Sequence, residues 1–209
     1  MNHPSVSCKT VGHSNRKMAD FIRLVKLHAV DCIVDVRSTP YSRRNPQFNR
    51  ETLKTDLELN SISYVHMGNR LGARYNNPEL LFPDGTADFS KIAQLPQFQE
   101  AIRILIDMMR HHAGMALMCA EKDPFTCHRF MLISRELAEN TVHVEHIISE
   151  SVTIRHDELE RHMIEKYGLN NRQLSLFETR MTPREMLEEA YRLRNHDLAF
   201  GKKHIFRQT

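Results

Sequence analysis

The order of hydrophobic and polar positions predicts strands that alternate with helices along the first 150 residues. Compact apolar runs predict strands that end at Val11 and that cover residues 32–36, 62–67, 115–119 and 142–148. We expect the last of these strands to be antiparallel or at an edge. Apolar residues at helical spacing predict helices over residues 18–25, 48–59, 98–109 and 126–139. This alternation predicts an α/β, Rossmann-like domain with a mostly parallel sheet and helices on both faces.

Three further stretches complete the predicted organisation. Residues 68–95 are rich in Gly, Asn, Pro and Asp, which is typical of a long loop that acts as a lid or binding loop. Residues 154–167 predict a polar helix that Gly168 ends. Thr182-Pro183-Arg184-Glu185 has the pattern of a capping box that begins another helix. We therefore expect an α/β domain over residues 1–150 and a helical C-terminal extension over residues 151–209.

Composition restricts the class of protein. The chain has 209 residues, of which 41% are hydrophobic and 26% charged, which suits one globular domain with a short appendage. No apolar run approaches the roughly 18 residues of a membrane span, and the N-terminus has no signal-peptide pattern. The four cysteines are too few for a disulfide scaffold. We expect a cytoplasmic protein, and the net charge of +3 gives no argument for nucleic-acid binding.

Reactive side chains follow four of the predicted strands. Ligands of open α/β sheets bind beyond the carboxyl ends of the strands, so these side chains are candidates for one common site. They are His13 and Ser14 after the first strand, Asp35, Arg37 and Ser38 after the second, His66, Asn69 and Arg70 after the third, and Cys119, Glu121, Cys127, His128 and Arg129 after the fourth.

Three of these segments resemble the DUF488 domain family of bacteria and archaea. They read T-V-G-H-S-N at residues 10–15, V-D-V-R-S-x-P at 34–40 and M-C-A-E-K-x-P-x-x-C-H-R at 118–129. The resemblance runs from about residue 10 to about residue 148. It implies a compact Rossmann-like unit with these motifs at one cleft. Because the family's function is unassigned, the resemblance implies a fold and a site more than a reaction.

Cys127 is a candidate nucleophile. Asp123-Pro124 reads as a helix entry, which would place Cys127 in the first helical turn, where the helix dipole lowers a thiol's pKa. The same turn, with His128 and Arg129, also suits phosphate binding. The alternative is that Cys119 and Cys127 are small buried hydrophobic residues.

Glu121 and Asp35 are candidates for acid–base catalysis. A carboxylate just past a buried strand is often desolvated, which raises its pKa toward the range of a general acid. The two carboxylates form an acid–base pair, or one of them orients His13, or each only makes a salt bridge to Arg37 or Arg129. The residues expected to contact substrate or phosphate are Ser14, Arg37, Ser38, Arg43, Arg44, Cys119, His128 and Arg129. The arginines near Tyr41 and Phe48 suit phosphate contact with base stacking, or else form a solvated loop.

A metal site would need His13, Cys119, Cys127 and His128 to converge. Their spacing matches no usual zinc signature. We therefore expect neither a metal nor another cofactor.

The extension carries Gln173-Leu174-Ser175-Leu176-Phe177, which is similar to the linear motif that docks bacterial polymerases and repair factors on the β sliding clamp. The resemblance implies that the clamp is a partner and that the protein works on or beside DNA. The alternative is that Leu174, Leu176 and Phe177 pack back on the domain.

Three functional hypotheses follow. The first is a DNA replication or repair accessory protein, docked on the clamp, whose core acts on a nucleotide or on a phosphate-bearing nucleic-acid substrate as a hydrolase or transferase. The second is a rhodanese-like thiol transferase unrelated to DNA. The third is an adaptor whose cleft binds a ligand without chemistry. None of them involves a membrane.

Overall fold

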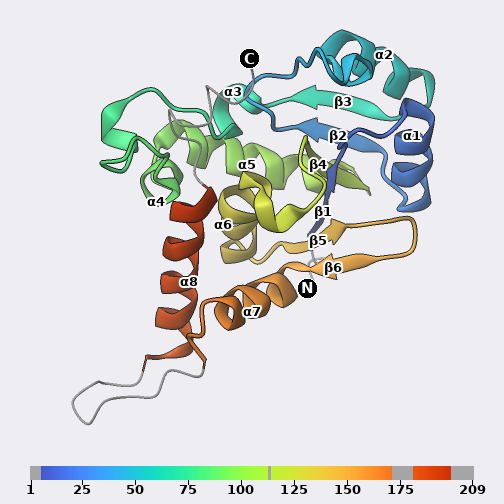
Figure 1. The fold of residues 1–209 in the computed structure, drawn as a ribbon. Coiled ribbons are helices and arrows are strands. Elements are labelled where there is room, and N and C mark those ends of the chain that lie inside the picture. Colours follow the sequence, from blue (N-terminus) through green and yellow to red (C-terminus); the bar gives the residue numbers. More distant parts are fainter. Residues whose placement is uncertain (1–5, 113, 171–180, 199–209) are drawn as a thin grey trace.

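The protein is an α/β fold built on a six-stranded sheet (Figure 1). The computed structural model describes residues 6–112, 114–170 and 181–198. The strands are β1 Ser7–Gly12, β2 Cys32–Asp35, β3 Ser63–His66, β4 Met115–Cys119, β5 His143–Ile147 and β6 Thr153–Arg155. Their order across the sheet is β3-β2-β4-β1-β5-β6. The first five are parallel, and β6 runs antiparallel to β5.

Helices cover both faces of this sheet, as the sequence predicted. Side chains of a strand point alternately to its two faces, so each internal strand contributes to two cores. In β4, Ala116 and Met118 belong to the core beneath α1 (Met18–Leu27) and α2 (Arg50–Leu59). Leu117 and Cys119 belong to the larger core beneath α5 (Pro96–His111) and α6 (Arg135–Glu139). Burial on both faces explains why the internal strands are nearly continuous apolar runs.

The far edge of the sheet differs from the prediction. The run at 142–148 was expected to be the last strand, antiparallel or at an edge, but β5 is internal and parallel to β1. The antiparallel edge strand is the three-residue β6, and the predicted polar helix begins only after it, as α7 His156–Lys166. A strand this short and polar has no hydrophobic periodicity that could reveal it.

The predicted loop at 68–95 contains short helices. They are α3 Gly68–Leu71, a 3-10 turn at Pro78–Leu80 and α4 Phe89–Ala93. The side chain of Asp88 caps α4 by accepting hydrogen bonds from the backbone N–H groups of Ser90 and Lys91. Helices of four or five residues are too short to show an amphipathic pattern.

The predicted helix at 126–139 is divided. Asp123 accepts a hydrogen bond from the backbone N–H of Phe125 (2.9 Å), so Asp123-Pro124 opens a 3-10 turn, Pro124–Thr126, rather than the helix itself. Cys127 follows in an extended conformation. A π-helix at Arg129–Ser134 then leads into α6. π-Helical turns are rare and are frequent at functional sites.

The C-terminal extension packs against the same core. The predicted turn is present, since Gly168 has a φ of +64°, and α8 (Pro183–Leu198) begins with the predicted capping box between Thr182 and Glu185. Ala190 and Tyr191 of α8 are buried in the larger core. Residues 173–177, the predicted docking motif, lie outside the described residues.

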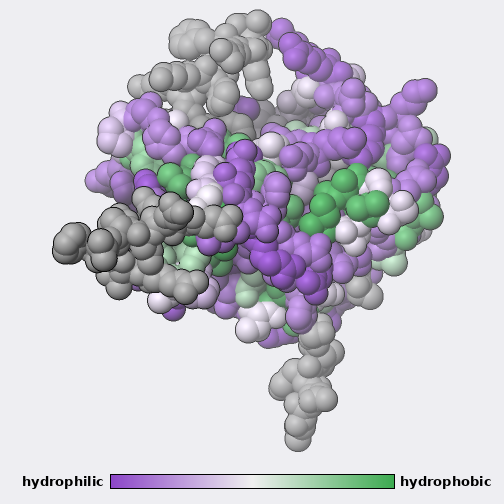
Figure 2. All heavy atoms as spheres, turned by 60° about the horizontal axis from the view of Figure 1, so that its bottom comes forward, coloured by the Kyte–Doolittle hydropathy of each residue, from purple (hydrophilic) through white to green (hydrophobic). Residues whose placement is uncertain are grey.

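Among the described residues, no helix combines the length and the apolar character needed to cross a bilayer. The face drawn in Figure 2 is largely hydrophilic, with apolar patches between the polar side chains.

Candidate functional site

The sheet order brings three of the predicted strand ends together. β4 lies between β2 and β1, so the residues that follow these strands meet at one carboxyl edge. The backbone N–H of His13 donates to the carbonyl of Cys119 (2.9 Å), and that of Ser14 donates to the carbonyl of Ala120 (2.8 Å). The loops after β1 and β4 are therefore joined at the site.

Asp35 is held by a buried ion pair. Its carboxylate, 0% exposed, accepts hydrogen bonds from Arg37 Nε (2.9 Å) and Arg37 Nη2 (2.6 Å). Tyr64 Oη donates to the same carboxylate (2.8 Å). This is the salt bridge that the sequence left open as an alternative to catalysis. With its oxygens engaged in this way, Asp35 holds the side chain of Arg37 in place.

His13 is a neutral, buried link in the same cluster. Its Nδ1 lies 2.7 Å from the carbonyl of Ser14 and donates to it, so Nε2 is free to accept from Arg37 Nη1 at 3.1 Å. The ring stacks on Phe48 with 4.2 Å between centroids. Burial, followed by the charge of Arg37, lowers the pKa of His13 to about 4. His13 therefore stays uncharged at neutral pH.

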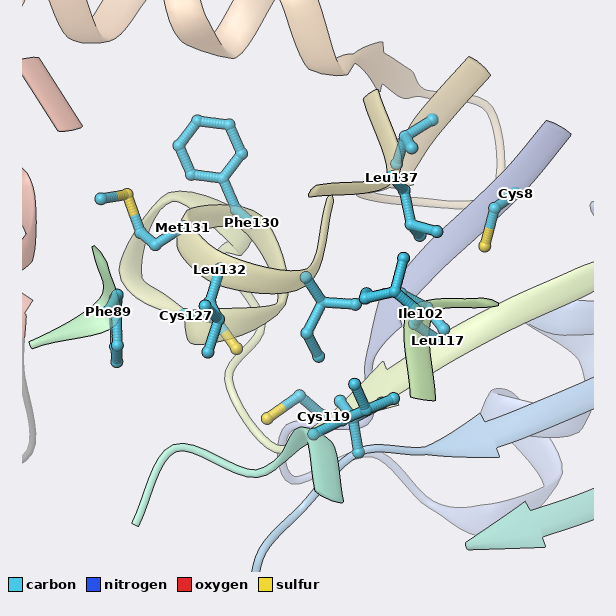
Figure 3. Close-up of a cluster of buried hydrophobic side chains, with 14 of the residues drawn as sticks. Cys8, Phe89, Ile102, Leu117, Cys119, Cys127, Phe130, Met131, Leu132 and Leu137 are labelled. Atoms are coloured by element: carbon cyan, nitrogen blue, oxygen red, sulfur yellow. The ribbon is translucent and has the colours of Figure 1, made fainter. Parts of the chain in front are cut away.

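A second cluster joins both predicted cysteines to Glu121 and His128. Cys119 Sγ and Cys127 Sγ lie 2.9 Å and 3.2 Å from Glu121 Oε2. His128 Nδ1 lies 3.8 Å from Cys119 Sγ and 3.7 Å from Cys127 Sγ. In Figure 3 the two sulfur atoms point toward each other, one from the end of β4 and the other from the turn before the π-helix. The three side chains of Cys119, Cys127 and His128 are all buried.

The sequence predicted that Cys127 lies inside the first turn of a helix. The structure instead places Cys127 just before that helix, at its start. Its φ of −133° and ψ of 143° are extended, and its Sγ accepts a 3.5 Å hydrogen bond from the backbone N–H of Arg129. This is the position and the contact of an N-cap side chain. The sulfur thus faces the positive end of the helix dipole.

The two thiols differ in acidity because of these contacts. Burial opposes ionisation of Cys127, but the hydrogen bond from Cys119 and the charges of Arg129 and His128 hold its pKa well below the usual value. The hydrogen bond to Cys127, followed by burial, raises the pKa of Cys119 well above it. Burial and the neighbouring Cys127 also raise the pKa of Glu121. Of the two thiols, Cys127 is therefore the one that ionises more readily.

The side chain of Arg129 holds the loop that follows β4. Its guanidinium is fully buried, and it donates to the carbonyls of Glu121 (2.7 Å) and Lys122 (3.0 Å) and to Thr10 Oγ1 (3.2 Å). Gly12 lets this loop approach β1, because a Cβ there would lie 1.8 Å from the carbonyl oxygen of Glu121. The predicted phosphate contact of Arg129 thus gives way to a structural role.

A cavity of about 80 Å³ opens onto this cluster. The side chain of Arg74 is exposed and has no partner among the described residues. The residues that line the cavity are Arg37, Ser38, Thr39, Ala73, Arg74, Cys119, Ala120, Glu121 and His128. Of the other residues expected to bind phosphate, Arg43 and Arg44 are exposed and do not line it, and Ser14 donates to Asn15 Oδ1.

Residues 17–135 match the family model described as "Domain of unknown function DUF488". The match covers more than half of the chain. The chain belongs to the DUF488 family. Comparisons with curated proteins and with solved structures find no match. The DUF488 match contains Asp35, Arg37 and the whole of the Cys119–Glu121–Cys127–His128 cluster, whereas β5, β6, α7 and α8 follow it.

Sequence reasoning missed two residues of this DUF488 site. Tyr64 lies inside β3 and was counted only as part of an apolar run, although it bonds Asp35. Arg74 lies in the stretch that was expected to be a binding loop, but no motif distinguished it from its neighbours. Only the strand order and the fold of residues 68–95 bring these two side chains to the edge where Asp35 and Glu121 lie.

Proposed function

We propose that the core is a hydrolytic enzyme that acts on a nucleotide or on another phosphate-bearing nucleic-acid substrate. The observation that carries the proposal is the composition of the cavity. Among the described residues that line it, Glu121 has the only carboxylate, and it lies beside the basic side chains of Arg37, Arg74 and His128. A carboxylate that faces water, next to cations that attract an anion, is the minimum that such a hydrolysis requires.

The size of the cavity indicates which part of the substrate enters. A volume of about 80 Å³ has room for a few waters or for one phosphate-sized group. The rest of the substrate would lie outside, along the exposed Arg74. In this arrangement Glu121 takes a proton from the attacking water and returns it to the leaving group, while the arginines hold the phosphate.

Replacement of Glu121 tests this function. We expect the wild-type protein to hydrolyse at least one member of a panel of nucleoside mono-, di- and triphosphates and oligonucleotide ends. Glu121→Gln should lower kcat at least about 100-fold, because the amide cannot take up the proton. Glu79→Gln, which changes an exposed glutamate of the 68–95 stretch, is the matched control and should retain full activity. A wild-type protein inactive on the whole panel, or an active Glu121→Gln, would rule the proposal out.

The second part of the proposal is recruitment to DNA by the β sliding clamp. Its support is the pentapeptide Gln173-Leu174-Ser175-Leu176-Phe177, which matches the clamp-docking motif at every position. The segment that carries it connects α7 to α8, and both flanking signals are present, with Gly168 in the left-handed conformation and the capping box at Thr182. An extended peptide whose apolar anchors enter a partner's groove needs a connection of this kind.

We expect Leu176→Ala/Phe177→Ala to weaken binding to purified β clamp by more than about tenfold, since these side chains are the apolar anchors. Binding is measured by fluorescence anisotropy of the labelled full chain. Arg172→Ala/Glu178→Ala, which changes only the polar flanks, should bind within about twofold of the wild type. Unchanged clamp binding together with a lowered Tm of the Leu176→Ala/Phe177→Ala protein would instead assign these residues to packing on the domain.

A further inference from the structure

The geometry of the cysteine cluster points to a metal site. We propose that Cys119, Cys127 and His128 bind one Zn²⁺ ion, with a water in the fourth position beside Glu121. The inference rests on the proposed hydrolytic function for the role of that water, but the binding of the ion stands on the geometry alone. Spacing along the sequence argued against a metal, whereas the fold brings three donor atoms to within 4.8 Å of one another.

The distances between donor atoms fit a tetrahedral ion. With Zn–S bonds of about 2.3 Å and Zn–N bonds of about 2.1 Å, tetrahedral angles separate sulfur from nitrogen by about 3.6 Å. His128 Nδ1 lies 3.8 Å and 3.7 Å from the sulfurs of Cys119 and Cys127. Both sulfur–nitrogen distances are therefore already close to those that the ion would impose, and all three donor atoms lie within 4.8 Å of one another.

The surroundings orient each donor correctly. His128 Nε2 lies 3.2 Å from the carbonyl of Val36 and donates to it, so in the neutral ring that binds a metal the lone pair of Nδ1 would face the sulfurs. A metal-binding histidine almost always donates its other N–H in this way. The backbone N–H of Arg129 donates to Cys127 Sγ, and the Arg129 side chain fixes the carbonyls of Glu121 and Lys122. These contacts explain why a fully buried arginine belongs to the site.

The donor set and its charge favour zinc. Two thiols and one imidazole form the soft ligand set that zinc sites use, and the ligands are buried among apolar side chains. Three acidic groups also lie close together there, namely the thiols of Cys119 and Cys127 and the carboxyl group of Glu121. A divalent cation would compensate the charge of two thiolates there, and each thiol that is still protonated would release its proton on binding.

The fourth position distinguishes a catalytic from a structural site. Two of the three ligands, Cys119 and His128, line the cavity together with Glu121, so an ion bound there would face open space on one side. A catalytic zinc keeps such a position for water and lowers the pKa of that water. In the proposed step Glu121 accepts a proton from the zinc-bound water, the resulting hydroxide attacks phosphorus, and the P–O bond to the leaving group breaks. The proton on Glu121 then passes to that leaving group.

The test is metal binding by the reduced, metal-free full chain. We expect one equivalent of ZnCl₂ to bind in competition with a chromophoric chelator, and CoCl₂ to give the intense d–d and thiolate charge-transfer bands of tetrahedral cobalt. Cys119→Ser, Cys127→Ser and His128→Asn should each lower zinc affinity by more than about 100-fold, beyond what the loss of an outer-shell contact costs. Cys8→Ser and Cys32→Ser are matched controls, because both are buried strand cysteines absent from the cluster, and should leave the affinity unchanged.

A second measurement removes the ambiguity of variants that fail to fold. In the wild-type chain, ZnCl₂ should slow alkylation of Cys119 and Cys127 by iodoacetamide at least about tenfold, read residue by residue by mass spectrometry. Absence of stoichiometric binding, or alkylation that zinc leaves unchanged, overturns the inference. Stoichiometric zinc binding without hydrolysis of any nucleotide would keep the metal site and reject the proposed function. Hydrolysis by the fully metal-free protein would keep the proposed function and reject the role given to the zinc-bound water.

Discussion

Asp35→Ala should destabilise the protein by about 3–5 kcal/mol, the range found when one partner of a buried ion pair is removed. The carboxylate of Asp35 and the side chain of Arg37 are 0% and 6% exposed, so water cannot replace the lost partner. Among the described residues, the guanidinium of Arg37 would keep two neutral acceptors, the carbonyl of Phe48 (2.8 Å) and His13 Nε2 (3.1 Å). Since domains are stable by only about 5–15 kcal/mol, the variant should be close to unfolding.

Urea unfolding at pH 7, followed by circular dichroism, measures this loss. Asp107→Ala is the matched control, because Asp107 pairs with Arg110 at 3.5 Å on the exposed surface of α5, where an ion pair contributes about 0–1 kcal/mol. The double variant Asp35→Leu/Arg37→Met should regain much of the loss, since apolar replacement of a whole buried pair is often close to neutral. If Asp35→Ala unfolds like the control, the ion pair does not hold the site as we describe.

The same ion pair shows how much of the site can be predicted from the sequence. Asp35, Arg37, Cys119 and Glu121 were placed at strand ends because buried parallel strands are recognisable as apolar runs, and the carboxyl ends of such strands lie at one edge. Which of these groups pair depends on strand order and side-chain direction. β4 lies between β2 and β1, and the backbone turn at Arg37 lets its side chain return to Asp35. Neither fact is encoded in a local pattern.

The cysteine cluster shows the limit of spacing rules. Such rules describe ligands held in one tight turn, whereas Cys119 ends a strand and Cys127 caps a helix after an intervening 3-10 turn. The loop between them closes on itself because Arg129 binds two of its carbonyl groups. The sequence indicated Cys127 and His128 as reactive groups, but their convergence with Cys119 requires this loop. β6 and α3 were missed because each is too short to show a hydrophobic periodicity.

Acidification should destabilise the protein between about pH 6.5 and pH 4. In the folded state burial and Arg37 lower the pKa of His13 to about 4, while in the unfolded chain it is near 6.5. In this window the unfolded state therefore binds the extra proton, so the free energy of unfolding rises with pH. The contribution of His13 is fully present above pH 6.5 and is lost as the pH falls toward 4. It is on the order of 3 kcal/mol at neutral pH relative to pH 4.

His146 adds to the same trend. It is fully buried between Thr10 Oγ1 (2.8 Å) and His156 Nδ1 (3.3 Å), and burial, followed by the charges of His156 and Arg129, lowers its pKa well below the usual value. Protonation of either ring at low pH would place a new cation beside an arginine, Arg37 for His13 and Arg129 for His146. Acid should therefore destabilise the carboxyl edge of β1 and the β5 side of the sheet together.

His13→Gln separates the two contributions. Glutamine keeps an oxygen that can accept from Arg37 Nη1 but does not titrate, so the stability of this variant should change less between pH 7 and pH 4.5 than that of the wild type. Urea unfolding at several pH values gives the slope directly. His111→Gln changes an exposed histidine at the end of α5 and should leave the slope unchanged. If His13→Gln and His111→Gln have the same slope, acid lability arises elsewhere, because a titrating His13 must lose its share of the slope when its imidazole is removed.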